Sequence, residues 1–149
     1  MRKMRTVILF VSLGLAGSAT PADALLSATG NVIAILAGDL FVGEAVGHLS
    51  GAGTLAIHSQ KDPALTCRGQ FTSSAELGGL GQMQCSDGAS ATFSFKRLNI
   101  FRGYGVGSFS RGAMNFTYGL SAEEAGPYLT LPEGKQLSQS GTELTLVDL

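Results

Sequence analysis

Residues 79–95 read GLGQMQCSDGASATFSF, and this stretch decides the fold. Apolar or small residues alternate with polar ones on both sides of Ser86-Asp87-Gly88, which is the two-residue period of a half-buried β-strand. A three-residue hairpin loop with Gly88 in the left-handed conformation sets the register. The predicted pairs are Cys85 with Ala89, Met83 with Ala91, Gly81 with Phe93, and Gly79 with Phe95. Phenylalanines therefore lie opposite glycines on one face of this hairpin.

The neighbouring stretches predict the same arrangement. Pairing Cys67 with Cys85 across residues 72–80 places Phe71 opposite Gly81 and Gly69 opposite Met83. A loop over residues 110–113 would pair Phe109 with Met114, Gly107 with Phe116, and Gly105 with Tyr118. Glycine opposite a ring is typical of curved sheets and small barrels. A shift of one residue in the pairing of two strands would turn every ring toward water. The alternation therefore favours pairings that keep the rings together on one face of the sheet.

The flanking segments extend the β pattern. Residues 31–37 and 40–48 are predicted to form a hairpin through Gly38-Asp39, and residues 142–147 a last strand with Leu144 and Leu146 inward. The capping-box spacing at residues 121–124 predicts one short helix. We expect an all-β fold, a single antiparallel β-barrel or sandwich of about eight or nine strands with that helix. A weak internal repeat of about 25 residues favours an up-and-down meander.

Residues 1–24, MRKMRTVILFVSLGLAGSATPADA, read as an export signal. A basic front precedes an apolar run over residues 6–17, and Ala22-Asp23-Ala24 has the small-x-small pattern of a cleavage site. The alternative, an uncleaved membrane anchor, needs about 20 apolar residues. We expect residues 25–149 to form one β domain without a transmembrane segment, located in the periplasm or secreted.

Cysteine content and charge narrow the function classes. Cys67 and Cys85 are the two cysteines, and an oxidising compartment favours a disulfide between them, whereas zinc would need further ligands. Without residues 1–24 the chain has seven lysines and arginines against ten aspartates and glutamates, a net charge of about −3. This mild and mixed charge does not indicate nucleic-acid binding.

The sequence nominates no catalytic, cofactor-binding or metal-binding residue. His48 and His58 are the two histidines and lack metal-ligand spacing. His48 lies near Ser50, but no third partner for a hydrolase accompanies them. A catalytic pair of acidic residues for glycoside hydrolysis, brought together from distant strands, stays an open alternative, but the sequence nominates no particular pair. The pattern favours a non-enzymatic role over an enzyme.

Two functional hypotheses follow. The first is a binding or structural module of the cell envelope with an unidentified partner, contacted by an outward strip formed by Arg97, Arg102, Tyr104 and Arg111. Solvated strand edges and turns are the alternative explanation of these residues. The second hypothesis is a small ligand-binding barrel for an apolar molecule, because eight strands can enclose one and glycines opposite rings leave room.

Several stretches resemble a group of small exported proteobacterial proteins of unknown function. They are GDLFVGEAVGHLSGAGTL, LTCRGQF, CSDGASATFSF, GYGVGSFSRGAMNFTYGLS and YLTLPEGK, spread over residues 38–137. The resemblance implies export and a β-rich domain. It implies no activity and therefore no catalytic residue.

Overall fold

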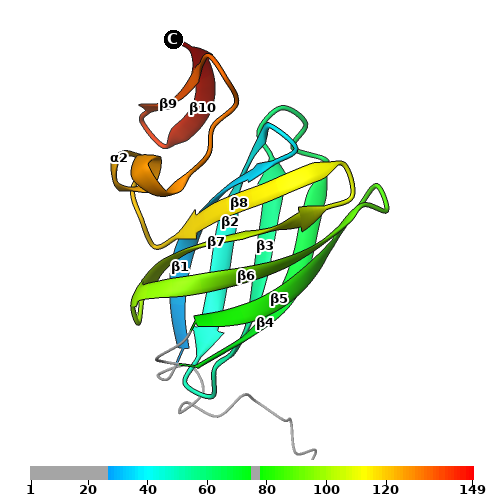
Figure 1. Cartoon of the computed structure of the whole chain (residues 1–149), viewed down its shortest axis with the longest axis vertical. Helices are drawn as coiled ribbons and strands as arrows, with labels where there is room; N and C mark the ends of the chain where they lie inside the picture. Colours follow the sequence, from blue (N-terminus) through cyan, green and yellow to red (C-terminus); the bar gives the residue numbers. More distant parts are fainter. Residues whose placement is uncertain (1–26, 75–77) are drawn as a thin grey trace, which may run out of the picture.

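Eight antiparallel strands close into a barrel in the order of the chain, and the last strand pairs with the first (Figure 1). The structure is a computed structural model that describes residues 27–74 and 78–149. The strands are β1 (Ser27–Leu36), β2 (Asp39–His48), β3 (Ala52–Ser59), β4 (Thr66–Ser74), β5 (Gly78–Cys85), β6 (Ser90–Asn99), β7 (Arg102–Phe109) and β8 (Gly112–Tyr118). The expected β fold is confirmed, and between barrel and sandwich the chain forms a barrel of the up-and-down type.

Aromatic rings on the inner wall lie against glycines of the neighbouring strand. Five rings cover a glycine that is their direct register partner: Gly53 with Phe71, Gly79 with Phe95, Gly81 with Phe93, Gly103 with Tyr118, and Gly105 with Phe116. A Cβ atom built on Gly81 would lie 2.3 Å from Cζ of Phe93. The rings also meet edge to face, with centroids 5.3 Å apart for Phe93 and Phe116. The missing side chains therefore give the rings their place against the wall.

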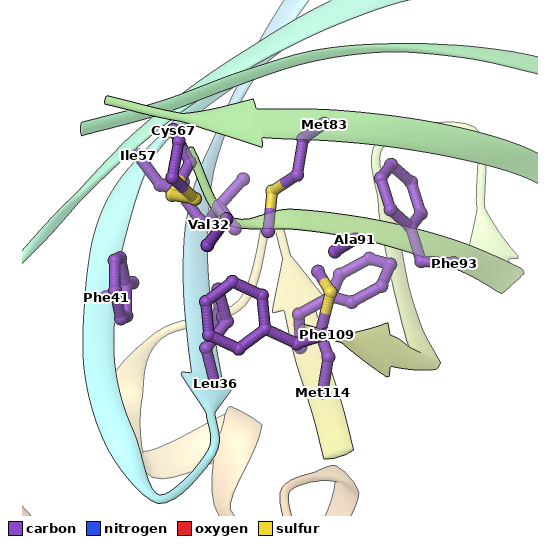
Figure 2. Packing of buried hydrophobic residues seen from close by; sticks show 14 of the residues in the cluster. Val32, Leu36, Phe41, Ile57, Cys67, Met83, Ala91, Phe93, Phe109 and Met114 are labelled. Carbon is purple, nitrogen blue, oxygen red and sulfur yellow. A yellow bond between two sulfur atoms is a disulfide. The ribbon is translucent and has the colours of Figure 1, made fainter. Parts of the chain in front are cut away.

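Large side chains fill the end of the barrel where β1 turns into β2. Figure 2 shows Leu36, Phe41, Met83 and Phe109 among the residues that meet there. The Cys67–Cys85 disulfide lies in this cluster and joins two residues that are directly opposite in register. The disulfide predicted from the sequence is present in the structure, and this end of the barrel is closed by packed side chains.

Residues 121–149, which we call the C-terminal arm, pack on the outside of the barrel (Figure 1). The arm contains α2 (Ala122–Ala125), the 3-10 turn η1 (Gly126–Tyr128), β9 (Lys135–Ser140) and β10 (Glu143–Asp148). Ser121 caps α2 in the predicted capping box. Apolar side chains of the arm and of the outer barrel wall share one buried cluster: Ile33, Ile35, Leu40, Leu120, Ala125 and Leu144. Leu144 is thus buried against the outer wall, whereas the sequence suggested that it points into the main core.

Polar side chains add hydrogen bonds between the barrel and the chain that follows β8. The Asn31 side-chain amide donates to the carbonyl of Leu120 at 2.7 Å. Asn115 donates to the carbonyl of Thr130 and accepts from its N–H, at 3.2 and 2.9 Å. Residues 32–36 of β1 are apolar on both faces, because one face lines the core and the other is covered by the arm.

Two predicted turns are wrong in detail. The β7–β8 turn consists of Ser110 and Arg111 alone, so Gly107 pairs with Met114 and Gly105 with Phe116, two positions from the predicted partners. A shift of two residues keeps the parity, so the predicted inner face is unchanged. The β1–β2 turn lies at Ala37-Gly38, one residue earlier than expected. Both residues have positive φ, 50° and 85°, a conformation that alanine rarely adopts.

Substituting a glycine under a ring should destabilise the barrel. A Cβ atom on Gly105 would lie 2.4 Å from Cζ of Phe116 and 2.3 Å from the carbonyl oxygen of Ser94. We expect Gly105→Ala to lower the free energy of unfolding by about 1–3 kcal/mol, measured by urea denaturation. Gly47→Ala is the control, because the nearest atom to its Cβ would be 4.0 Å away. Equal losses in the two variants would contradict the role of the rings.

Removing the disulfide should also lower stability. The bridge closes a loop with a sequence separation of 18 residues. The double substitution Cys67→Ala and Cys85→Ala should therefore reduce the free energy of unfolding by about 3 kcal/mol. Urea unfolding of the oxidised wild type and of the double variant measures the difference. A variant that unfolds at the wild-type midpoint would show that the bridge does not stabilise the fold.

Candidate functional site: a cavity at the open end of the barrel

The end of the barrel opposite the packed cluster contains a cavity of about 290 Å³. Its wall comes from inward side chains of six strands, and the main apolar contributors are Val32, Ala45, Leu55, Ile57, Phe71, Phe93, Phe95, Met114 and Phe116. Its mouth is formed where β1 begins, where β2 ends, and at the connection between β6 and β7. The cavity is therefore a pocket with a packed floor rather than a channel through the barrel.

The cavity exists because the side chains differ between the two ends of the barrel. Toward the mouth, β2 presents the small residues Ala45 and Gly47 to the interior. The rings of Phe71, Phe93 and Phe95, which also line the cavity, lie against glycines of the wall and leave the centre open. Toward the floor, the core positions carry larger side chains such as Leu36, Phe41 and Met83.

Two other hollows lie on the outside of the barrel and have different walls. They measure about 780 and 540 Å³ and are bordered mainly by outward strand residues such as Arg68, Gln70 and Gln82. These shallow outer surfaces do not enclose a molecule. The internal cavity, with its apolar wall and few polar groups, has the character of a small-molecule site.

Exposed apolar side chains surround the mouth of the cavity. Leu49, Ile100 and Phe101 are 72%, 63% and 59% exposed, and all three border the cavity. Contiguous exposed apolar groups on a soluble surface typically mark a binding site. We call these three residues the apolar rim.

Arg97 enters the mouth from β6 and lies on the inner face of the barrel. It has the same parity as Phe93 and Phe95, which are buried inside. Its guanidinium donates to the Ser73 hydroxyl on β4 and, at 3.2 Å, to the carbonyl of Ile100. In the sequence, the spacing of Arg97 from Phe93 and Phe95 by even numbers of residues indicates an inward side chain. Its position among other basic residues suggests an outward one instead.

Tyr118 faces the cavity from β8, two strands away from Arg97. Gly103 of β7 is the register partner of both residues, so Arg97, Gly103 and Tyr118 form one row across three strands. The phenol oxygen is buried and has no hydrogen-bond partner among the described residues. Burial raises the pKa of Tyr118, and the nearby positive charge of Arg97 opposes that shift.

The four residues predicted to form one outward strip are not brought together. Arg97 lines the cavity, whereas Arg111 lies in the turn at the opposite end of the barrel, where it pairs with Asp87 at 2.7 Å. Arg102 and Tyr104 do face outward from β7. The expectation of a single strip is corrected, because alternate residues of a strand point to opposite faces.

Arg102 and Tyr104 contact the C-terminal arm. Arg102 forms an ion pair with Glu124 of α2 at 2.9 Å. The ring of Tyr104 stacks on Tyr128 of η1, with the centroids 4.8 Å apart. Both outward residues therefore have an intramolecular role in holding the arm on the barrel. Contact with a separate partner stays a prediction for all four residues.

The described part of the chain shows no cluster of three or more histidine, cysteine, aspartate or glutamate side chains that could hold a metal ion. Within residues 27–74 and 78–149, no helix has the length and apolar character needed to cross a membrane. His48 borders the cavity mouth, and His58 is on β3. The predicted signal peptide, residues 1–24, lies outside the described residues.

Comparisons with family models, with curated proteins and with solved structures found no match for this chain. The resemblance to exported proteobacterial proteins therefore stays an expectation from the sequence. Any functional argument depends on the geometry of the barrel and its cavity.

The buried phenol of Tyr118 should make stability sensitive to alkaline pH. Its raised pKa means that the folded chain holds the proton more tightly than the unfolded chain. The associated stabilisation is present below about pH 10 and is lost as the pH rises through the folded pKa. We expect the free energy of unfolding to fall less steeply above about pH 10 in Tyr118→Phe than in the wild type. Tyr128→Phe, which removes an exposed phenol, should follow the wild type, and identical slopes for all three would contradict this assignment.

Proposed function

We propose that this chain is an exported binding protein that holds a small apolar molecule inside the barrel. The observation that carries the proposal is the cavity of about 290 Å³, with its floor closed by packed side chains and its mouth open. This volume lies at the lower end of the range of about 300–1,000 Å³ for small-molecule pockets. An eight-stranded barrel is wide enough to hold one such ligand.

The lining and the apolar rim support an apolar ligand. Aromatic and aliphatic side chains form most of the wall, so transfer of apolar surface from water into the cavity is favourable. Leu49, Ile100 and Phe101 would contact the ligand as it enters, because they border the mouth. No catalytic role for the chain is proposed.

Export is part of the proposal for two reasons. The disulfide between Cys67 and Cys85 is compatible with an oxidising, extracytoplasmic compartment. The pattern of residues 1–24 predicts a cleaved signal peptide. Together they favour a periplasmic or secreted protein.

The hypothesis of an envelope module that contacts a partner through its outer surface has less support. Its candidate residues Arg102 and Tyr104 are engaged with Glu124 and Tyr128 of the same chain. The cavity, in contrast, is not needed for a purely structural role.

Filling the cavity tests the proposal. We expect the neutral fluorophore N-phenylnaphthylamine to bind the purified protein with increased fluorescence. Ala45 borders the cavity, so the ring introduced by Ala45→Phe would occupy part of its volume. The fluorophore should then lose contacts equivalent to about two methylene groups, which weakens binding about tenfold. Native mass spectrometry of the protein as purified should also detect a bound small molecule that Ala45→Phe lacks.

The matched control is Ala56→Phe on the neighbouring strand. Ala56 is exposed and is the register partner of Glu44, so its side chain faces outward. This variant should bind the fluorophore like the wild type. The proposal fails if the wild type does not bind the fluorophore, or if both variants bind it with unchanged affinity.

A further inference from the structure

The mouth of the cavity carries a positive charge that has no carboxylate partner among the described residues. Among the described residues that line the cavity, Arg97 is the one arginine, and none is a lysine, aspartate or glutamate. None of the ion pairs within the described part of the chain involves it. Removing a charge from water is costly unless an opposite charge or hydrogen bonds compensate for it.

The hydrogen bonds that Arg97 makes to the described residues leave some of its donors unused. A guanidinium has five N–H donors in a planar arrangement. Within the described residues, Arg97 donates to the Ser73 hydroxyl and to the Ile100 carbonyl, and its Nε atom is buried without a partner. The two existing hydrogen bonds hold the side chain in place at the mouth, and the remaining N–H groups of the guanidinium have no identified partner in the described part of the chain.

Tyr118 supplies a second unused donor on the same side of the cavity. Its hydroxyl is buried and has no partner within residues 27–74 and 78–149, and Gly103 separates it from Arg97 in the cross-strand row. A Cβ atom on Gly103 would lie 2.3 Å from that hydroxyl oxygen, so the phenol extends over the glycine toward β6. A tyrosine phenol is protonated at neutral pH, the upward shift of the pKa of Tyr118 acts in the same direction, and a protonated phenol can donate.

Two donors that lack a partner in the described part of the chain, one of them cationic, lie at the polar edge of an apolar cavity and are suited to one kind of ligand. We propose that the cavity binds a small amphipathic carboxylate, with its apolar tail against the rings and its head group accepting hydrogen bonds from Arg97 and Tyr118. This assignment rests on the proposed function and specifies its ligand class. A carboxylate has two coplanar oxygens, which match the planar donors of arginine.

The size of the cavity limits the tail. A volume of about 290 Å³ at the small end of ligand pockets favours a short chain over a long one. Octanoate is therefore the probe, and octanol is its neutral counterpart with the same number of carbon atoms. Isothermal titration calorimetry of the full domain with each compound separates the contribution of the head group from that of the tail.

We expect octanoate to bind the wild type at least about tenfold more tightly than octanol. Arg97→Met should weaken octanoate binding by about tenfold to a hundredfold, because hydrogen bonds to charged groups are lost. Tyr118→Phe should weaken octanoate binding by about threefold to tenfold and preserves the shape of the ring. Octanol binding should stay within about twofold in both variants.

Arg102→Met is the matched control, since Arg102 is exposed on the outer face and pairs with Glu124. It should leave the binding of both compounds unchanged. Circular dichroism of every variant confirms that the barrel is folded, and Tyr118→Phe provides an independent test if Arg97→Met does not fold.

The outcomes separate this inference from the proposed function. If octanol and octanoate bind equally and neither variant discriminates between them, the carboxylate assignment is overturned while the binding barrel stands. If octyl sulfate binds as tightly as octanoate with the same dependence on Arg97, the site recognises negative charge and the carboxylate assignment is also overturned. If neither these compounds nor N-phenylnaphthylamine bind, the proposed function itself fails.

Discussion

The packing of aromatic rings on strand glycines is the constraint on which the rest of the structure depends. Each of the five rings needs the space of a missing side chain on the adjacent strand. Any shift of one residue between two strands would turn the ring to the outside and bring a polar side chain into the core. The same packing keeps the rings close to the wall, so the interior near the mouth is not filled. Register, closure and cavity therefore share one physical origin.

Much of the fold could be predicted because this constraint is visible as a two-residue alternation. The pairings of Gly81 with Phe93 and of Cys67 with Cys85 agree with the structure, and so does the capping box at Ser121. The β7–β8 turn was wrong because Gly112 resembles a loop glycine although it begins β8. The outer location of Leu144 could not be predicted, since alternation identifies a buried face without indicating which surface covers it.

The site was less predictable than the fold. The sequence indicated that a barrel of this kind could enclose an apolar molecule, but the volume of the interior depends on how rings on distant strands are arranged. Arg97 was assigned to an outward strip by its basic neighbours, although its parity with Phe95 indicated the interior. Tyr118 was identified as an inward residue, but only the structure shows that its hydroxyl has no partner among the described residues.

The C-terminal arm has a consequence for the order in which the chain assembles. Its surface on the barrel combines Ile33 and Ile35 from β1 with Asn115 from β8, and these strands are neighbours only once the barrel is closed. The β1–β8 ladder has five residue pairs, against ten for the β1–β2 ladder. The arm therefore packs across the short β1–β8 pairing, which joins the first and last strands of the barrel. The arm can therefore dock fully only after β1 and β8 have paired. In a chain whose barrel is still open, the surface that binds residues 121–149 is incomplete.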